Sequence, residues 1–166
     1  MLKKTLLLLS LSAACCSFAH AHVSLDTKQA VAGSYQKISL RVPHGCSGSD
    51  TVALRVQVPE GMLSVKPQPK AGWKLSTSQG DYKQSYTLHG ATVSSGVKEV
   101  TWRGGPLAND HFDEFSLMVY LADNLATDKP LLMPTIQECT QGETRWIDKD
   151  QQADSPAPSL RIVSKP

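Results

Sequence analysis

Alternating apolar and polar residues dominate the chain. In the stretch 35–43, "YQKISLRVP", Ile38, Leu40 and Val42 fall on one face, and lysine, serine and arginine fall on the other. The stretch 51–59, "TVALRVQVP", repeats the pattern, and both stretches end at a proline, which cannot donate a ladder hydrogen bond. This period of two predicts β-strands with one buried face.

The same reasoning predicts further strands, separated by turn sequences such as "PEGM", "QPKAGW" and "RGGPLAND". They are expected at 23–27, 63–66, 73–78, 84–89, 98–103, 112–122, 131–138 and 144–147. No segment keeps an apolar stripe of helical period. Short strands at regular spacing therefore predict an all-β fold, an antiparallel sandwich of the immunoglobulin-like type.

The first 21 residues have the features of a bacterial secretion signal. Lys3 and Lys4 precede the apolar run 6–11, which is far shorter than the roughly 20 residues of a membrane-spanning helix. We expect this segment to be removed and the mature chain to be periplasmic, without a membrane span. Ala19-His20-Ala21 favours cleavage before His22; cleavage before His20 and lipoprotein processing at Cys15 are the alternatives.

Composition changes this picture in one respect. The formal charge of +2 comes entirely from the two signal lysines, so the mature chain is neutral and carries no basic cluster for nucleic acid. About 145 residues suit one domain, expected at 22–148. Residues 149–166 are polar and proline-containing and predict a tail, with an edge strand at 160–163 as the exception.

Two cysteines, Cys46 and Cys139, remain after the signal is removed. An even pair in an oxidising compartment predicts a disulfide, which would close a loop of roughly 90 residues. The alternative is a pair of thiols that binds Cu(I).

A histidine at the mature N-terminus offers a metal chelate. Its α-amine and imidazole Nδ1 both carry a lone pair near neutral pH, and two nitrogens in one plane suit Cu(II). If the chain instead began at His20, His22 would stand third and the amine, two amides and an imidazole could surround Cu(II) or Ni(II). Taken alone, His44 reads as a loop residue and Trp146 as core. No catalytic motif occurs, and we expect no enzyme activity.

Several segments, in order, resemble the YcnI-like copper-binding domain of bacterial exported proteins, in particular its Gram-negative branch with paired cysteines. They are "AHAHVSLD", "AGSYQKISLRVPHGCSGS", "VQVPEGM", "PKAGWKL", "GGPLAND-HFDEF", "QECTQGETRWI" and "DSPAPSLRI". The resemblance implies an immunoglobulin- or fibronectin-like sandwich that binds one Cu(II). It assigns His22 as a mono-histidine brace and Trp146 as the indole that packs over the ion.

The family's assisting glutamate has no counterpart here, because the corresponding loop reads "HGCSGSD". His44 is the preferred substitute, with Asp50 and Glu138 as alternatives and Glu114 as a further candidate. The resemblance thus predicts a periplasmic protein of copper trafficking or homeostasis, with other copper chaperones as partners. A copper-dependent redox enzyme of the polysaccharide monooxygenase kind and a metal-free structural or adhesive sandwich are the alternatives.

Overall fold

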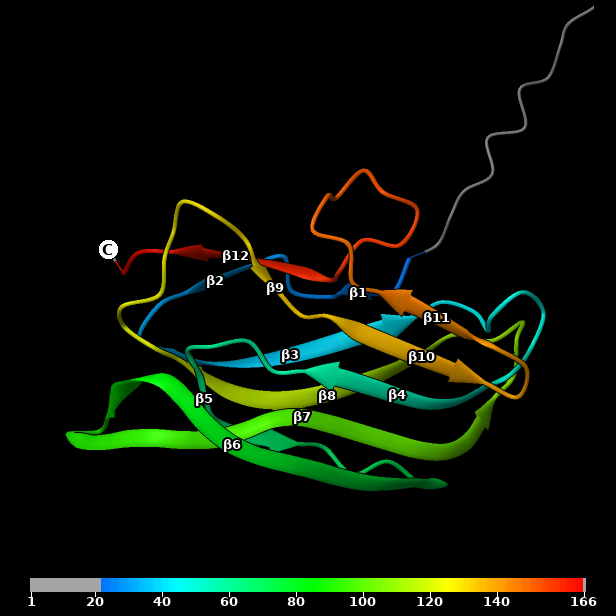
Figure 1. Cartoon of the computed structure of the whole chain (residues 1–166), viewed down its shortest axis with the longest axis horizontal. Coiled ribbons are helices and arrows are strands. Elements are labelled where there is room, and N and C mark those ends of the chain that lie inside the picture. Colours follow the sequence, from blue (N-terminus) through cyan, green and yellow to red (C-terminus); the bar gives the residue numbers. More distant parts are fainter. Residues whose placement is uncertain (1–21, 166) are drawn as a thin grey trace, which may run out of the picture.

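The computed structural model describes residues 22–165; the predicted signal segment, His20 and Cys15 lie outside this range. Two sheets face one another and a third, smaller sheet lies at one side (Figure 1). The predicted all-β sandwich is confirmed, as is the disulfide between Cys46 and Cys139. Within the described range, no helix has the length and apolar character needed to cross a membrane.

The first sheet has four antiparallel strands. Their order is β1 (Ser24–Leu25), β3 (Ser34–Val42), β8 (Asp113–Leu121) and β5 (Met62–Pro67). The long β3–β8 pair runs from Ser34 opposite Leu121 to Val42 opposite Asp113. Alternation in both strands turns their apolar residues inward, as the sequence pattern requires.

The second sheet has five antiparallel strands. Their order is β11 (Glu143–Trp146), β10 (Thr135–Cys139), β4 (Thr51–Gln57), β7 (Ala91–Leu107) and β6 (Trp73–Leu88). A shift in register near Thr51 interrupts the pairing of β4 with β7, which is the irregularity of a β-bulge.

The core fills the space between these two sheets. Trp102 and Phe115 lie at its centre, with ring centroids 5.5 Å apart, and Trp73 packs edge-on against Phe115 at 5.0 Å. Aliphatic side chains from both sheets surround them, including Ile38, Leu40, Val42, Leu54, Val56, Val100, Leu117 and Val119. Trp73 and Trp102 are therefore packing residues of the core.

The third sheet corrects the expectation of a polar tail after residue 148. It contains β2 (Gln29–Val31), β12 (Ser159–Val163) and β9 (Leu131–Leu132), in that order. β12 pairs in parallel with β2 and antiparallel with β9, so it is the central strand of this sheet and not an edge strand. Leu160 and Ile162 are buried in the main core, which explains why the segment is held.

The strands predicted at 73–78 and 84–89 are parts of one long strand, β6, which forms a hairpin with β7. Two register shifts, one of them between Asp81 and Tyr86, interrupt the pairing without ending the strand. His89 lies in the turn with a φ of 50°, and its Nε2 is 3.0 Å from the hydroxyl oxygen of Tyr35. His89 therefore belongs to the turn and not to the end of the strand expected at 84–89.

An ion pair links the hairpin to the turn before β5. Lys98 Nζ lies 2.9 Å from Glu60 Oε2, and Glu60 Oε1 accepts a hydrogen bond from the backbone nitrogen of Lys83 at 2.9 Å. Burial alone would raise the pKa of Glu60, but the contacts with Lys98 and Lys83 outweigh burial and lower that pKa below its ordinary value.

Candidate metal centre

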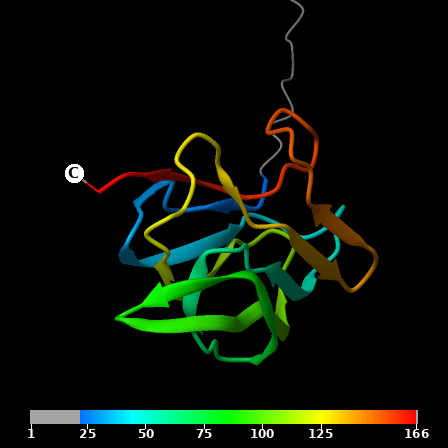
Figure 2. The same cartoon turned by 60° about the vertical axis from the view of Figure 1, so that its left-hand side comes forward.

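His22 and Trp146 lie side by side although they stand at opposite ends of the domain sequence. Their ring centroids are 5.7 Å apart and their planes are inclined by 55°. His22 is half-buried just before β1, and Trp146, the last residue of β11, is 5% exposed. Figures 1 and 2 show the start of the described chain beside the end of β11.

Strand register explains why the indole of Trp146 points inward. Trp146 pairs with Thr135 of β10, whose side chain is fully buried. Residues directly opposite one another in an antiparallel pair share a face, so both side chains enter the sandwich. The face is partly polar, because Thr135, Gln137 and Cys139 are the buried positions of β10.

The side-chain amide of Gln137 connects three parts of this end of the molecule. Trp146 Nε1 donates a hydrogen bond to Gln137 Oε1 at 3.0 Å. Gln137 Nε2 donates to the backbone oxygen of His44 at 2.7 Å and to Thr51 Oγ1 at 2.7 Å. Gln137 is 0% exposed, so these bonds satisfy an amide that has no access to solvent.

The loop that carries His44 begins directly after β3. A short antiparallel bridge joins Cys46 to Ser49, and backbone hydrogen bonds of 2.9 Å run both ways between them. No residue with a side chain fits at position 45, because its Cβ atom would overlap the backbone carbonyl of Ser49. The sequence "HGCSGS" therefore folds into a tight loop whose shape depends on that glycine.

Within this loop, the ring of His44 has a defined tautomer. Its Nδ1 is 2.6 Å from the backbone oxygen of Gly45, and a carbonyl oxygen can only accept. Nδ1 therefore carries the hydrogen. In the neutral ring, Nε2 then has a lone pair that takes no part in this hydrogen bond. This is the arrangement in which an imidazole can serve as a metal ligand.

The disulfide fixes the loop to the strand that carries Gln137. Cys46 and Cys139 are joined with their Cα atoms 6.0 Å apart, and the backbone nitrogen of Cys46 is 3.1 Å from the sulfur of Cys139. Both are buried. The covalent link thus lies two residues from Gln137 and two residues from His44.

Asp50, one of the alternative ligands, has a structural role. Its Oδ1 accepts a hydrogen bond from the backbone nitrogen of Asn109 at 2.9 Å, and its backbone oxygen accepts one from Thr140. These contacts join the loop after β3 to the loops before β8 and after β10. The carboxylate of Asp50 is therefore already engaged as a hydrogen-bond acceptor, which makes it a weaker candidate for a metal ligand.

Glu138 lies on the other face of β10 from Gln137. Its carboxylate oxygens are 2.8 Å from Arg103 and 3.6 Å from Arg55, on the outside of the second sheet. The hydrogen bond and charge of Glu99, with a smaller contribution from Glu138, raise the pKa of Arg55. Because successive side chains of a strand alternate, Glu138 points away from Trp146.

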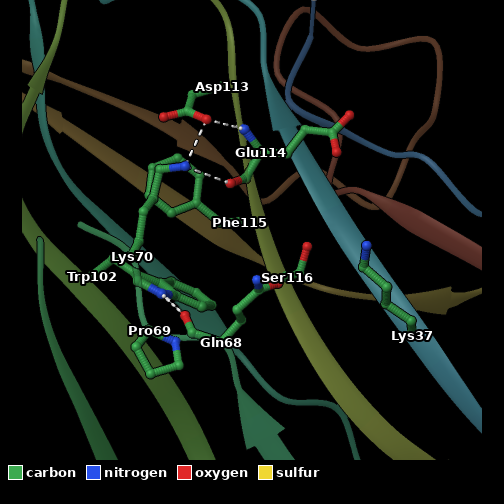
Figure 3. A pocket seen from close by; sticks show the side chains of 9 residues that line it. All are labelled: Lys37, Gln68, Pro69, Lys70, Trp102, Asp113, Glu114, Phe115 and Ser116. Atoms are coloured by element: carbon green, nitrogen blue, oxygen red, sulfur yellow. Dashed lines mark hydrogen bonds and ion pairs between the residues drawn. The ribbon is translucent and has the colours of Figure 1, made fainter.

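Glu114 also lies outside, on the outer face of the first sheet. Its carboxylate is 3.2 Å from the hydroxyl of Ser39 and 3.7 Å from Arg41. It borders a cavity of about 240 Å³ in which Lys70 binds Asp113 at 2.7 Å and the backbone oxygen of Glu114 at 3.1 Å (Figure 3). The geometry favours neither Glu138 nor Glu114 as a partner of His22.

The donors at this end are few. Among residues 22–165, no three or more His, Cys, Asp or Glu side chains are grouped so that they could hold a metal ion. A chelate that uses the α-amine and the imidazole of one residue does not require such a group. The donor set near Trp146 therefore depends on the first residue of the mature chain, and cleavage before His22 would give a chelate of the amine and the imidazole of that residue.

Sequence reasoning missed Gln137 and Thr51, which join the predicted residues to one another. One signal was present: Thr135, Gln137 and Cys139 alternate in "TIQEC", so a polar row occupies one face of a strand. A polar row of this kind is usually interpreted as solvent-facing. Only the partners on neighbouring elements show that it points inward.

Comparison with known proteins places the fold and the family. No curated protein matches the chain. A crystal structure of an uncharacterized protein from Nocardia farcinica, which has an immunoglobulin-like fold, aligns with a TM-score of 0.62 and 21% identity, and the alignment covers 86% of this chain and 98% of the other. The predicted immunoglobulin-like architecture is thereby confirmed. The model of the family described as "Domain of unknown function (DUF1775)" matches residues 22–162, and the chain therefore belongs to this family.

Proposed function

We propose that this protein binds one Cu(II) ion at the N-terminus of its mature chain and carries it as cargo in periplasmic copper trafficking or homeostasis. The DUF1775 family includes the YcnI-like copper-binding domains. The observation that carries the proposal is the packing of the imidazole of His22 against the indole of Trp146, with ring centroids 5.7 Å apart. The family match begins at residue 22, in agreement with cleavage before His22.

The chemistry of the proposed site follows from the first residue. Cleavage before His22 would release an α-amine whose lone pair, together with imidazole Nδ1, closes a six-membered chelate ring around a metal. Among divalent first-row ions, Cu(II) binds nitrogen donors most tightly and accepts tetragonal arrangements. An internal histidine lacks the α-amine, so the proteolytic step would complete the ligand.

Trp146 and His44 would contribute differently. The indole of Trp146 is 5% exposed, so its ring can shield one side of a cation bound at His22 and attract it through its π-electrons. His44 lies in the loop that is hydrogen-bonded to Gln137, and its Nε2 lone pair is available in the neutral ring. We propose His44 as the third ligand, in preference to Asp50.

A site with few strong donors suits reversible exchange of the ion. The two nitrogens of His22 form the only chelate in the proposal, and a further donor comes from a separate loop. An incoming chaperone can therefore replace these donors one at a time. For this reason we propose a copper carrier or buffer, and not an enzyme with a permanently held metal.

The test compares three forms of the exported protein. Mass spectrometry first fixes the N-terminal residue, and titration with Cu(II) followed by electron paramagnetic resonance then measures stoichiometry and the ligand field. The form that begins at His22 should bind one Cu(II). A form that begins at Ala21 keeps every side chain of the domain but places the His22 nitrogen in a peptide bond, so it should lose the chelate formed by the amine and imidazole of His22 and show a changed ligand field. His22→Ala should lose the one-to-one binding.

His89→Ala serves as the matched control. His89 lies in the turn between β6 and β7, where it contacts Tyr35 and Tyr120, and its loss should leave Cu(II) binding unchanged. Equal Cu(II) affinity in the forms that begin at Ala21 and at His22 would contradict the proposed chelate.

A further inference from the structure

We propose that Gln137 is the positioning residue of this site: its buried amide holds the indole of Trp146 against His22 and fastens it to the loop that carries His44. The inference rests on the proposed function, because the position of Trp146 matters for binding only if copper binds at His22. No group of Gln137 is proposed to touch the ion.

The direction of the Gln137 amide is fixed by its partners. The indole nitrogen of Trp146 can only donate, so the atom 3.0 Å away must be the amide oxygen. The backbone oxygen of His44 can only accept, so the atom 2.7 Å away must be the amide nitrogen. The opposite orientation would place two donors together at one end and two acceptors together at the other.

The amide of Gln137 is also fully used. Both N–H groups have acceptors, the backbone oxygen of His44 and the hydroxyl of Thr51, each at 2.7 Å. The side chain is 0% exposed, so water cannot replace any of these partners. A buried polar network with every member satisfied is rigid, whereas the loss of one member leaves the others unpaired.

A purely structural role accounts for only part of this network. Neighbouring inward positions of the same sheet, such as Leu54 and Val56 of β4, are filled by aliphatic side chains. An aliphatic residue at position 137 would avoid the cost of desolvating an amide, but it would leave the indole nitrogen of Trp146 and the backbone oxygen of His44 without these partners. What the glutamine adds is orientation, since it joins the Trp146 ring and the His44 backbone through one planar group.

Orientation of Trp146 is what the proposed site needs. A tryptophan ring can turn about its side-chain bonds, and its contact with a cation depends on which face is presented. The hydrogen bond from Trp146 Nε1 to Gln137 fixes the rotation of the ring about these side-chain bonds. The hydrogen bond from Gln137 Nε2 to the backbone oxygen of His44 positions the His44 loop. The indole of Trp146 and the proposed third ligand are therefore held in a fixed position relative to one another.

The test uses the native form that begins at His22. Gln137→Met keeps the length of the side chain and removes every polar atom. We expect Cu(II) affinity to fall by about 10-fold or more, as for other groups that orient a metal's partners. We also expect a changed electron paramagnetic resonance spectrum and weaker quenching of tryptophan fluorescence by Cu(II), because Trp146 is the tryptophan that packs against His22.

Thr135→Val is the matched control. Thr135 lies on the same face of the same strand, is 0% exposed, and also loses a buried hydrogen bond, that from its Oγ1 to the backbone oxygen of Met133. It should lower thermal stability without changing the Cu(II) spectrum. If Gln137→Met does not fold, Gln137→Asn replaces it, because an amide one methylene shorter cannot reach Trp146 and His44 together.

A double-mutant cycle separates the indole from the loop. In Trp146→Phe the donor to Gln137 is absent, so Gln137→Met should reduce Cu(II) affinity less in that background than in the native protein. Equal reductions in both backgrounds would show that Gln137 does not act through Trp146 and would overturn the inference.

The possible failures are distinguishable. If the native form that begins at His22 does not bind Cu(II), the proposed function is wrong and the positioning role of Gln137 is wrong with it. If it binds Cu(II), and a folded Gln137 variant shows the same affinity, spectrum and quenching, the proposed function stands and only the positioning role is wrong.

Discussion

The disulfide between Cys46 and Cys139 should supply a large part of the stability of the domain. The two residues are 93 positions apart, and the bond joins the loop after β3 to the end of β10. In the chain-entropy model, closing a loop of this length removes unfolded-state entropy worth about 4.7 kcal/mol at 25 °C. Replacing both cysteines with alanine should therefore lower the free energy of unfolding by roughly 3–5 kcal/mol.

Equilibrium unfolding in urea measures this change. A domain of this size is expected to show a slope of about 2 kcal/mol per molar urea, so the midpoint should fall by roughly 2 M. Tryptophan fluorescence and far-ultraviolet circular dichroism should give coincident transitions if unfolding is two-state. Chemical reduction of the native protein provides the control, because it opens the same loop without a substitution.

One result would refute the reasoning. If the double alanine variant and the reduced native protein both unfold within about 0.5 M urea of the oxidised protein, with unchanged slope, the loop is not constrained in the way the entropy model requires. The hydrogen bonds of Gln137 and Asp50 would then account for the attachment of the loop.

Two further predictions concern parts of the fold away from the proposed metal site. Glu60→Gln should cost about 1 kcal/mol at pH 7, because the contact with Lys98 lowers the pKa of Glu60 in the folded state. That stability is present above the unfolded pKa and is lost as the pH falls through the folded one, so thermal melts of native and variant proteins should converge in acid. Leu160→Ala should cost about 2–5 kcal/mol in urea unfolding, since Leu160 is 0% exposed in β12; a loss below about 1 kcal/mol would mean that β12 is not part of the cooperative unit.

Alternation along the chain was sufficient to predict β3 and β4, because the apolar residues that face the core recur at every second position in each strand. It failed at the long hairpin, where bulges near Asp81 break the period without breaking the strand. It also misjudged β12: Leu160 and Ile162 identify a strand, but its parallel partner β2 is too distant in sequence for any local signal. Pairing between distant segments depends on the whole fold.

The candidate site was predictable to a similar extent. His22 and Trp146 followed from resemblance to a family, not from their surroundings, and the structure brings them into contact. The third ligand stayed open because loop geometry decides it, and Gln137 was overlooked because a glutamine in an alternating strand carries no sign of burial. Hydrogen-bond partners, which the sequence does not reveal, distinguish these roles.

The position of β12 also affects when the domain can finish folding. β2 follows the N-terminal segment closely, but its pairing partner in the described sheets, β12, is a strand near the end of the sequence. A chain that emerges N-terminus first would hold β2 with that edge unpaired until the last strand arrived. Such a long-range pairing slows folding and postpones cooperative closure. Arrival of the last strand, and not emergence of the first strands, would then set the moment at which the first residues of the described domain acquire their final surroundings.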